Sequence, residues 1–319
     1  MTPKNRYAHW HSLPGPILVL GDRGFIGQTL VRYMLNEEYR IVGASRTKLN
    51  INSYERAQLD VRDKIKARDL MRHIRPKLII NLVGERSRSG RASEYRTAIE
   101  MNVLGSLNLA EVILDEKLDC RLLNIGTCEV FGNSESPFLE SSSHSPITGY
   151  SFSKSVTDKL FKLLGESYDL DFMILNPSVA YGPGLSSNMF ISDLVESIQL
   201  GKKFKMSPGE QVRDLIYIDD LVKAILQCLI FWSTGLSLNI GSGHIISMNS
   251  LARLICSKMM TDQSLVIDPI RNPYRINEIM DYRLDSTLAM RLLEWSPLMS
   301  IDEGLNRTIH FLTHNKPDM

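Results

Sequence analysis

Pro16-Ile17-Leu18-Val19-Leu20-Gly21-Asp22-Arg23-Gly24-Phe25-Ile26-Gly27 is the stretch that decides the fold of this chain. Four consecutive apolar residues, Ile17–Leu20, predict a buried strand, and three glycines spaced three residues apart follow it. The next residues, Gln28–Leu35, carry apolar side chains at helical spacing. A strand, a glycine turn and a helix in this order predict an anion site, because the free N–H groups and the dipole of a helix N-terminus favour negative charge.

In a dinucleotide-binding turn each glycine has its own role. We expect Gly21 to permit the tight turn, Gly24 to let the backbone approach a pyrophosphate, and Gly27 to let helix and strand pack closely. The alternative is a purely structural corner that holds no ligand.

Composition and charge limit the classes of protein to consider. The chain has 319 residues, a net charge of +1 and 23% charged residues, so we expect a sizeable core and no strong attraction to nucleic acid or a membrane surface. The four cysteines form no CxxC pair and the seven histidines lack metal-ligand spacing, which argues against a metal site and a disulfide scaffold. Without a long apolar span or a signal peptide, the sequence predicts a cytoplasmic protein with no transmembrane helix, and residues 1–15 as a peripheral lead-in.

Strands and helices alternate through the first half of the sequence. Further strands are expected at Arg40–Ser45, Leu59–Val61, Lys77–Gly84, Arg121–Gly126 and Phe172–Asn176, and helices at Lys64–Arg75, Ala98–Lys117 and Tyr150–Tyr168. The apolar side of the first of these helices is predicted to hold Ile65, Leu70, Met71 and Ile74. Ser134–Ser145, rich in Ser and Glu, predicts a surface loop. The alternation indicates an α/β fold with a Rossmann-like, doubly wound parallel sheet.

From about Tyr181 onward the alternation loosens. Helices are expected at Asn188–Leu200, Asp219–Trp232, Met248–Met259 (with Ser247 as its N-cap) and Ser286–Leu293, and short strands at Leu238–Gly243 and Leu265–Ile267. We therefore expect a dinucleotide-binding domain over residues 1–180 and a smaller, mainly substrate-binding domain over 181–319, partly interleaved with the first. The second domain would close over a substrate at the carboxyl edge of the sheet.

The end of the second predicted strand bears on the choice of dinucleotide. An acidic residue there usually binds the 2′-hydroxyl of the adenosine ribose, whereas a nearby Arg accommodates a 2′-phosphate. This strand ends in Ser45-Arg46, and Arg23 in the glycine turn could supply a second guanidinium. The sequence thus favours NADP(H) over NAD(H), the alternative being that both arginines are solvated loop residues. Asp60-Val61 would flank the adenine, unless Asp60 only caps a turn.

A tyrosine and a lysine four residues apart, Tyr150 and Lys154, open the helix after the fifth strand. At this spacing they lie on one helix face, one turn apart. A cationic Lys beside a phenol stabilises the phenolate and lowers its pKa. Such a phenol can exchange a proton with a substrate oxygen near neutral pH, on the side where the nicotinamide should lie.

Several motifs in order make the chain, from about Ile17 to Leu312, resemble the extended short-chain dehydrogenase/reductases, specifically the NAD(P)-dependent nucleotide-sugar epimerase/dehydratase family. The motifs are Gly21-x-x-Gly24-x-x-Gly27, Asn81-Leu82-Val83-Gly84, Asn102-Val103-Leu104-Gly105, Gly126-Thr127-Cys128-Glu129-Val130-Phe131-Gly132, Tyr150-x-x-x-Lys154, Tyr181-Gly182-Pro183-Gly184, Arg213-Asp214-Leu215-Ile216-Tyr217-Ile218-Asp219-Asp220 and Asn239-Ile240-Gly241-Ser242-Gly243. Each motif is weak alone, but the ordered set is specific.

The resemblance implies roles for particular residues. Tyr150 would be the acid/base, Lys154 would hold the nicotinamide ribose and tune Tyr150, and Thr127 would hydrogen-bond the 4-oxygen of the sugar. Asn102 would help to hold the site through backbone and water contacts. The implied cofactor contacts also include Phe25, Ile26, Leu82, Val83, Pro177 and Ser178.

For the substrate, the resemblance points to Arg213 and Arg275 as the residues that grip a nucleotide diphosphate, because the planar fork of Arg matches phosphate oxygens. The alternatives are surface ion pairs, with Asp214 for Arg213 and with Glu278 for Arg275. A homodimer through the helices that begin near Ala98 and Tyr150 is also implied.

Two departures from the family pattern affect the substrate contacts and the reaction. Val179 stands where the family often has an Asn that touches the substrate. In the 4,6-dehydratases of the family the Thr is followed by Asp and Glu; the Glu removes the C5 proton and the middle residue helps water leave from C6. Here Glu129 is in place but Cys128 is the middle residue, and a thiol is a weak hydrogen-bond donor. Cys128 is interpreted as a small buried residue beside the substrate rather than a nucleophile.

The sequence therefore predicts an NADP(H)-dependent enzyme acting on a nucleotide-diphosphate sugar, first of all a reductase of a 4-keto-6-deoxy sugar, in which Tyr150 protonates O4. The alternatives are a 4,6-dehydratase that uses Glu129 as base, and a 4-epimerase. A hypothesis of another class is a non-catalytic dinucleotide sensor, which would need only the glycine turn.

Overall fold

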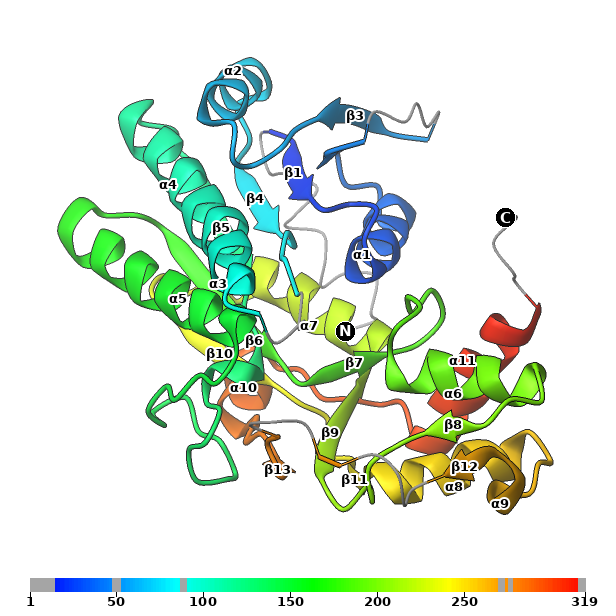
Figure 1. Ribbon diagram of the computed structural model, residues 1–319. Coiled ribbons are helices and arrows are strands. Elements are labelled where there is room, and N and C mark those ends of the chain that lie inside the picture. Colours follow the sequence, from blue (N-terminus) through cyan, green and yellow to red (C-terminus); the bar gives the residue numbers. More distant parts are fainter. Residues whose placement is uncertain (1–14, 48–52, 87–90, 269–272, 275–277, 315–319) are drawn as a thin grey trace. The chain divides into compact units, whose positions relative to one another are not determined.

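The computed structural model describes residues 15–47, 53–86, 91–268, 273–274 and 278–314 (Figure 1). The predicted lead-in lies outside these residues, except for Gly15. The chain forms two compact units. Unit 1 takes in the chain through Asn133, together with Ser143–Asn176 and Ile225–Leu238, and unit 2 takes in Ser134–Ser142, Pro177–Ala224 and the chain from Asn239 onward.

Unit 1 is built on a seven-stranded sheet, which confirms the predicted α/β fold. Its strands are β1 (Ile17–Leu20), β2 (Ile41–Ser45), β3 (Glu55–Gln58), β4 (Leu78–Asn81), β5 (Arg121–Ile125), β6 (Phe172–Pro177) and β10 (Ser237–Ile240). Their spatial order is β10-β6-β5-β4-β1-β2-β3, and the pairs from β3 through to β6 are parallel. The central strands β1, β4 and β6 are buried throughout, as expected of a sheet covered on both faces.

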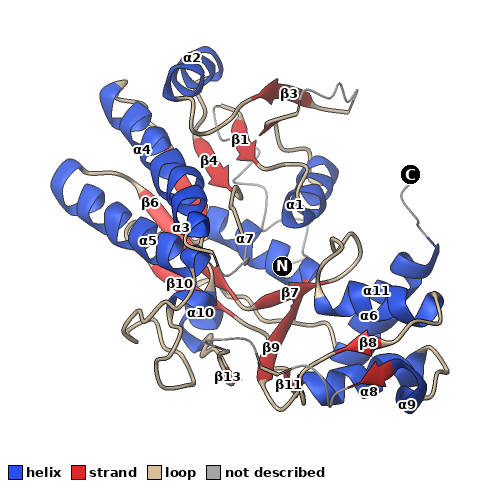
Figure 2. Ribbon diagram, in the orientation of Figure 1, coloured by secondary structure: helices blue, strands red, loops and turns tan. Residues whose placement is uncertain are grey.

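Helices connect successive strands of this sheet (Figure 2). They are α1 (Phe25–Asn36), α2 (Lys64–Ile74), α3 (Ser93–Ala98), a π-helical segment (Ile99–Leu104), α4 (Gly105–Asp115), α5 (Gly149–Tyr168) and α7 (Ile218–Ile230), whose C-terminal half lies in this unit. α2 packs on α4 and α4 on α5. Because β1→β2 and β3→β4 run in opposite directions along the sheet, right-handed crossovers put α1 and α2 on opposite faces.

Two predictions in the first half were wrong. The third strand is Glu55–Gln58 rather than Leu59–Val61, in register with Val42–Ser45. It is an edge strand with polar residues, so hydrophobicity did not mark it. In α2 the residues facing the core are Ala67 and Met71, with Leu70 and Ile74 partly buried, whereas Ile65 is 73% exposed. Ile65 precedes Ala67 by two residues, about 200° around the helix, which turns it away from the core.

Unit 2 contains a smaller sheet centred on β9 (Val212–Tyr217). β7 (Val179–Tyr181) and β13 (Asp281–Tyr282) pair with it in parallel and β11 (Ile245–Ser247) pairs antiparallel. A separate parallel pair is formed by β8 (Phe204–Lys205) and β12 (Ile267–Asp268). The helices are α6 (Phe190–Gln199), the start of α7, α8 (Met248–Lys258), α9 (Gln263–Val266), α10 (Thr287–Leu292) and α11 (Ile301–His314). α6 packs against both α8 and α11.

Unit 2 confirms the predicted N-cap and corrects two other predictions. Ser247 caps α8, its hydroxyl accepting from the N–H of Ser250. Leu265–Ile267 is not a strand throughout, because Asp262 caps the short helix α9 and only Ile267 and Asp268 form β12. The predicted surface loop 134–145 contains Phe138, which is fully buried. Phe138 donates its N–H to the carbonyl of Arg283 at 2.8 Å, and its ring packs edge-on against Tyr282, so this loop is part of the core of unit 2.

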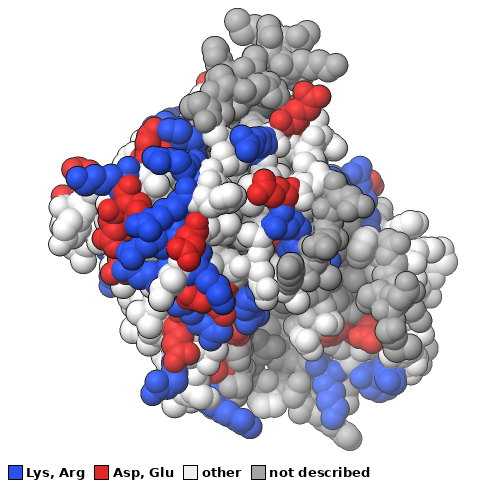
Figure 3. All heavy atoms as spheres, turned by 90° about the horizontal axis from the view of Figure 1, so that it is seen from above, with Lys and Arg blue, Asp and Glu red and all other residues white. Residues whose placement is uncertain are grey.

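Surface charge is mixed rather than concentrated. Figure 3 shows Lys and Arg side chains intermixed with Asp and Glu on the face viewed from above. Some of these opposite charges form ion pairs; for example, Arg72 on α2 pairs with Glu116 at the end of α4. One helix in the described part of the chain, Ser93–Asp115, is long and apolar enough to cross a membrane, but 56% of its apolar window is buried inside the protein, as for a core helix.

Candidate active site

The glycine turn between β1 and α1 has the shape that a phosphate cradle requires. Gly21 has φ +81°, a conformation that favours glycine, and its carbonyl accepts from the N–H of Gly24 at 2.9 Å. A Cβ at Gly27 would lie 2.2 Å from the carbonyl oxygen of Gly21, so only glycine fits. Gly24 is the N-cap of α1 and offers no side chain to the first helical N–H groups. These N–H groups, and the interior of the turn, fit the pyrophosphate of a dinucleotide.

A buried ion pair joins the glycine turn to the tips of β2 and β3. The Asp22 carboxylate accepts from the guanidinium of Arg56 at 2.6 Å and from the phenol of Tyr54 at 2.8 Å, and both charged side chains are at most 5% exposed. Arg56 also donates to the hydroxyl of Ser45 at 2.7 Å. Burial, followed by the hydrogen bond to Asp22, raises the pKa of Tyr54 to about 12. The sequence predicts no role for Asp22, Tyr54 or Arg56, because their spacing gives no local pattern.

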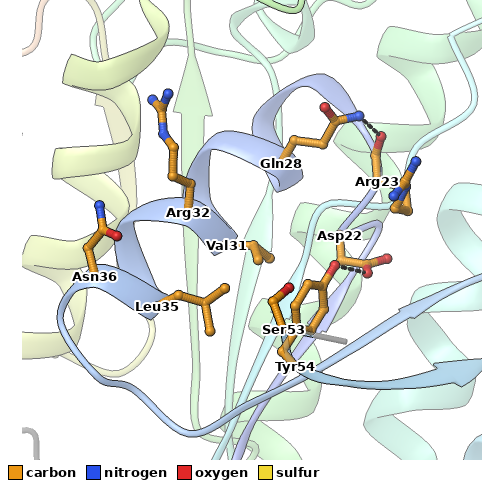
Figure 4. A pocket seen from close by; sticks show the side chains of 9 residues that line it. All are labelled: Asp22, Arg23, Gln28, Val31, Arg32, Leu35, Asn36, Ser53 and Tyr54. Atoms are coloured by element: carbon orange, nitrogen blue, oxygen red, sulfur yellow. Dashed lines mark hydrogen bonds between the residues drawn. The ribbon is translucent and has the colours of Figure 1, made fainter. Parts of the chain in front are cut away.

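Arg23 and Arg46, the predicted phosphate ligands, are exposed at this edge. A hollow of about 310 Å³ opens beside the glycine turn, and Figure 4 shows Arg23 and Tyr54 on its walls. Its lining is Asp22, Arg23, Gln28, Val31, Arg32, Leu35, Asn36, Ser53 and Tyr54. The side-chain amide of Gln28 donates to the carbonyl of Arg23 at 2.7 Å and steadies the turn.

Asp60 caps a turn, as the alternative interpretation of it foresaw. Its carboxylate accepts from the backbone N–H of Arg62 at 3.0 Å and pairs with that guanidinium at 2.6 Å. The hydrogen bond to Arg62 is the main reason why the pKa of Asp60 is lowered. Val61 is buried at 3% exposure in the core, and its carbonyl accepts from Asn108. A contact of either residue with adenine stays a prediction.

Tyr150 and Lys154 lie one turn apart near the start of α5, as predicted. A capping box between Thr148 and Ser151 fixes this helix start. The ammonium of Lys154 donates to the carbonyls of Ile125, at 2.8 Å, and Val83, at 3.3 Å. It therefore clamps α5 to the carboxyl ends of β4 and β5. Burial, and to a lesser extent the charge of Arg86, lowers the pKa of Lys154 to about 8.

Thr127 lies two residues after the end of β5 and caps the short helix Cys128–Val130. Its hydroxyl oxygen accepts from the N–H of Glu129 at 3.3 Å, so its own proton is free to be donated to a bound oxygen. Its backbone N–H donates to the side-chain carbonyl of Asn176 at 3.1 Å. Glu129 is half-buried and Cys128 is only 2% exposed, in keeping with the interpretation of Cys128 as a small buried residue.

Asn102 lies in the π-helical segment, where the helical hydrogen-bond ladder widens. Its side chain accepts from the N–H of Glu85 at 2.7 Å and donates to the hydroxyl of Ser153 at 2.8 Å. The hydroxyl of Thr157 donates to its backbone carbonyl at 3.1 Å. Asn102 thus ties the loop after β4 to α5 through direct contacts, next to Lys154 in that helix. The backbone N–H of Val83 donates to Asn81, which fixes the same loop.

Two of the predicted substrate residues, Arg213 and Val179, lie in unit 2. Arg213 pairs with Glu278 and not with Asp214, and it donates to the carbonyls of Val212 and Ile279 at 2.8 Å. Asp214 is buried and accepts from Ser242 and from the hydroxyl of Ser178. Val179 begins β7 directly after Pro177 and Ser178. Arg275 lies outside the described residues.

Known proteins resemble this chain over nearly its whole length. The NAD dependent epimerase/dehydratase family matches residues 17–241. A dTDP-glucose 4,6-dehydratase of Escherichia coli is 27% identical, with 94% of each chain covered. A UDP-glucose 4-epimerase of Thermotoga maritima, solved with UDP-glucose, has TM-score 0.86 and 24% identity, covering 93% of this chain and 98% of that one. A dTDP-glucose 4,6-dehydratase of Streptomyces venezuelae, solved with NAD, has TM-score 0.86 and 24% identity, covering 94% and 97%.

Proposed function

The chain belongs to the NAD dependent epimerase/dehydratase family of enzymes, and from this membership we propose that it oxidises a nucleotide-diphosphate sugar at C4 as the first step of its reaction. The observation that carries the proposal is the clamped ammonium of Lys154, one helical turn from Tyr150 and held by the carbonyl of Ile125, two residues before Thr127. This arrangement supports a phenol that can take a proton from a sugar hydroxyl.

The residues of the chain divide the proton chemistry between them. The cation of Lys154 stabilises the phenolate of Tyr150, which accepts the proton of the C4 hydroxyl. The hydroxyl of Thr127, whose oxygen already accepts from the N–H of Glu129, donates to the same substrate oxygen. When bound, the nicotinamide supplies reversible hydride exchange with a sugar carbon.

For the steps after oxidation we propose 4,6-dehydration. The support is Glu129, two residues from Thr127, together with the 27% identical dTDP-glucose 4,6-dehydratase. Glu129 would remove the proton from C5 and pass it to the hydroxyl at C6, which then leaves as water. The cofactor would return to its starting state within each turnover, so no net oxidant is consumed.

A 4-epimerase is the second candidate, and Cys128 favours it. The buried thiol stands where the dehydratases have an acidic residue, and it is a poor proton donor to a departing hydroxyl. Epimerisation needs Tyr150, Lys154 and Thr127 but no acid at position 128. None of the relatives described above is a reductase, so the reductase that the sequence favoured gives way to these two reactions.

A substrate screen separates these reactions. The purified protein is incubated with dTDP-glucose, UDP-glucose and other nucleotide sugars at catalytic amounts of NAD⁺ or NADP⁺, and the products are read by mass spectrometry. Loss of one water indicates the dehydratase, and an unchanged mass with a new sugar after hydrolysis indicates the epimerase. In a separate incubation with NADPH and a nucleotide-linked 4-keto-6-deoxy sugar, stoichiometric consumption of NADPH would support the reductase hypothesis. If the protein binds the cofactor but converts none of these sugars, the hypothesis of a non-catalytic dinucleotide sensor is supported.

Glu129→Gln tests the dehydratase directly. We expect it to stop water loss while sparing the oxidation at C4, because only the C5 proton requires a carboxylate base. Glu55→Gln, at an exposed glutamate on β3, is the matched control. Unchanged dehydration in Glu129→Gln would remove this residue from the mechanism.

We also propose that NADP(H) is the preferred cofactor. Asp22 is neutralised by Arg56, so the net charge facing a 2′-phosphate comes from the exposed Arg23 and Arg46. The Streptomyces venezuelae relative was solved with NAD, and a preference for NADP(H) would distinguish this chain from it.

We also propose that the protein is a homodimer and that it is located in the cytoplasm. Tyr95, Leu104 and Phe152 are 40–46% exposed on α3, the π-helical segment and α5, and the rings of Tyr95 and Phe152 lie 6.1 Å apart. Large apolar side chains gathered on neighbouring helices support a partner surface. The four cysteines are buried free thiols, as suits a reducing compartment. Light scattering of wild type and Phe152→Glu would test the dimer.

A further inference from the structure

A chain of buried polar groups runs behind Thr127 in unit 1. The N–H of Thr127 donates to Oδ1 of Asn176 at 3.1 Å, and Nδ2 of Asn176 donates to the hydroxyl of Ser237 at 3.0 Å. That hydroxyl donates to Oδ2 of Asp158 at 3.3 Å. Asn176 and Asp158 are each 2% exposed and Ser237 between them is partly buried, so water has limited access to these bonds. We call Asn176, Ser237 and Asp158 the polar relay.

The direction of every hydrogen bond in the polar relay follows from its last member. An ionised carboxylate only accepts, so Asp158 requires the Ser237 hydroxyl to donate its single proton. Ser237 can then only accept from Asn176, which turns the NH₂ group of that amide toward Ser237. The carbonyl oxygen of Asn176 is thereby turned toward the N–H of Thr127, where an acceptor is needed.

We propose that Asp158 is a positioning residue that acts on Thr127 through the orientation of the Asn176 amide. The inference rests on the proposed function, in which Thr127 contacts the substrate oxygen. Asp158 lies one turn beyond Lys154 on α5, so the same helix carries the acid/base, its cation and the residue that sets this relay.

Two basic side chains face the carboxylate of Asp158. The ammonium of Lys162, one turn further along α5, lies 3.0 Å from Oδ1. The imidazole of His144 lies 3.7 Å from Oδ2 and bonds the hydroxyl of Ser155 at 3.0 Å. Burial lowers the pKa of His144, so the positive charge beside Asp158 comes from Lys162.

Asp158→Asn should invert the relay. Lys162 must donate, so the carbonyl of the new amide turns toward it and the NH₂ group turns toward Ser237. The Ser237 hydroxyl then donates to Asn176, whose amide flips and presents NH₂ to the N–H of Thr127. Two donors now face each other at a buried site, and Thr127 shifts.

The decisive variant is the double exchange Asp158→Asn with Asn176→Asp. A carboxylate at position 176 accepts from both Thr127 and Ser237, and the amide at position 158 donates to Ser237. Every hydrogen bond is therefore made again, and only the two bonds to Ser237 reverse their direction. Net charge is unchanged. If the two residues acted independently, the effects of the two substitutions would add, and the exchange would not restore activity.

The kinetic test compares four proteins on the substrate found in the screen. We expect Asp158→Asn to lower kcat by about tenfold or more, since small misplacements of a contact residue cost up to about 100-fold. KM and cofactor affinity should stay near wild type. The double variant should recover most of kcat. Lys159→Gln, at an exposed lysine next to Asp158 on α5, is the matched control and should leave kcat nearly unchanged.

A second readout needs no substrate. Selective ¹⁵N-threonine labelling reports hydrogen exchange at the Thr127 amide, which should speed up in Asp158→Asn and slow again in the double variant. If Asp158→Asn fails to fold, Ser237→Ala breaks the same relay and should give the same faster exchange. Unchanged hydrogen exchange at the Thr127 amide in Asp158→Asn would overturn the polar relay. A double variant whose kcat is no higher than that of Asp158→Asn would overturn it as well. Failure of the proposed function would instead appear as full turnover in Tyr150→Phe, whatever the exchange shows.

Discussion

The tips of β2 and β5 lie at the carboxyl edge of the same parallel sheet, yet they bury charge in different ways. At β2 the guanidinium of Arg56 is matched by the carboxylate of Asp22 at 2.6 Å, with Ser45 and Tyr54 completing the network. Beyond β5 the ammonium of Lys154 is held by two backbone carbonyls. The hydrogen bond to Asp22 raises the pKa of Arg56, whereas the pKa of Lys154 falls to about 8 because burial opposes its charge.

This difference suits the two proposed tasks. A neutralised network at β2 holds the glycine turn in place and leaves exposed arginines to meet a phosphate. A cation bound by neutral acceptors beyond β5 is available to stabilise a phenolate one turn away. A charge that is paired gives rigidity, and a charge that is not paired can be used in chemistry.

The largest expected effect is on catalysis, in the region beyond β5 that contains Tyr150 and Lys154. Tyr150→Phe should lower kcat by about 10³–10⁴-fold, because general acid–base catalysis contributes up to this amount. The fold should be unaffected, since only a hydroxyl is removed. Turnover of the substrate identified in the screen, with circular dichroism as a check on folding, is the measurement. Activity close to wild type would end the catalytic assignment.

In the region of the Asp22–Arg56 ion pair, at the tip of β2, the main effect should be on stability. Arg56→Met leaves the Asp22 carboxylate buried without its cation, which should lower the free energy of unfolding by about 3–5 kcal/mol. Arg72→Met is the matched control: its pair with Glu116 is exposed, and its loss should leave the free energy of unfolding nearly unchanged. Urea denaturation of both variants measures the difference. Equal effects would mean that the buried pair does not hold this edge.

The pH dependence of stability should distinguish the two ends further. Lys154 has a folded-state pKa of about 8, below its ordinary value of 10.5, so between these values the unfolded chain binds more protons. The contribution of Lys154 to stability therefore rises with pH, by up to about 1.4 kcal/mol per pH unit, from about pH 8 to pH 10. Urea denaturation at pH 7.5 and 9.5 should show this rise in wild type relative to Lys154→Met. Parallel curves for the two proteins would contradict a depressed pKa.

The smallest expected effect concerns the exposed arginines at β2. Arg46→Ala should weaken NADP⁺ binding by about tenfold and leave NAD⁺ binding nearly unchanged, because one charge-assisted contact to the 2′-phosphate is lost. Calorimetric titration with both dinucleotides measures the ratio, and Arg72→Ala, at an exposed arginine on α2 that does not line the hollow, is the control. Equal losses for both dinucleotides would show that Arg46 does not select the phosphate.

Much of the fold of unit 1 was predictable from the sequence. Three predicted strands consist of apolar runs that are typical of a sheet covered on both faces, and the structure has a strand at each of them: Ile17–Leu20, Leu78–Asn81 and Phe172–Asn176. The edge strand Glu55–Gln58 was missed because it has a neighbour on one side only. The short strands around β9 were missed as well, since strands of two or three residues leave no periodic pattern.

The candidate site divides in the same way. Tyr150 and Lys154 could be found because four residues on a helix are one turn whatever surrounds them. The glycine turn was equally local, since Gly21 and Gly27 are required by the turn itself. The partners of Asp22, by contrast, come from residues 32 and 34 positions away, and Ser237 and Asp158 are 79 positions apart. No window of sequence contains both members of such a pair.

The sequence by itself determined where the apolar central strands of unit 1, the glycine turn and the Tyr–Lys helix lie, because these depend on backbone conformation and on periodicities of a few residues. Only the tertiary structure decided which partners the buried charges have: Asp22 with Arg56, Arg213 with Glu278, and Lys154 with the carbonyl oxygens of Ile125 and Val83. The physical reason is that a buried charge or amide is governed by the groups that folding brings within about 3 Å, from whatever distance along the chain.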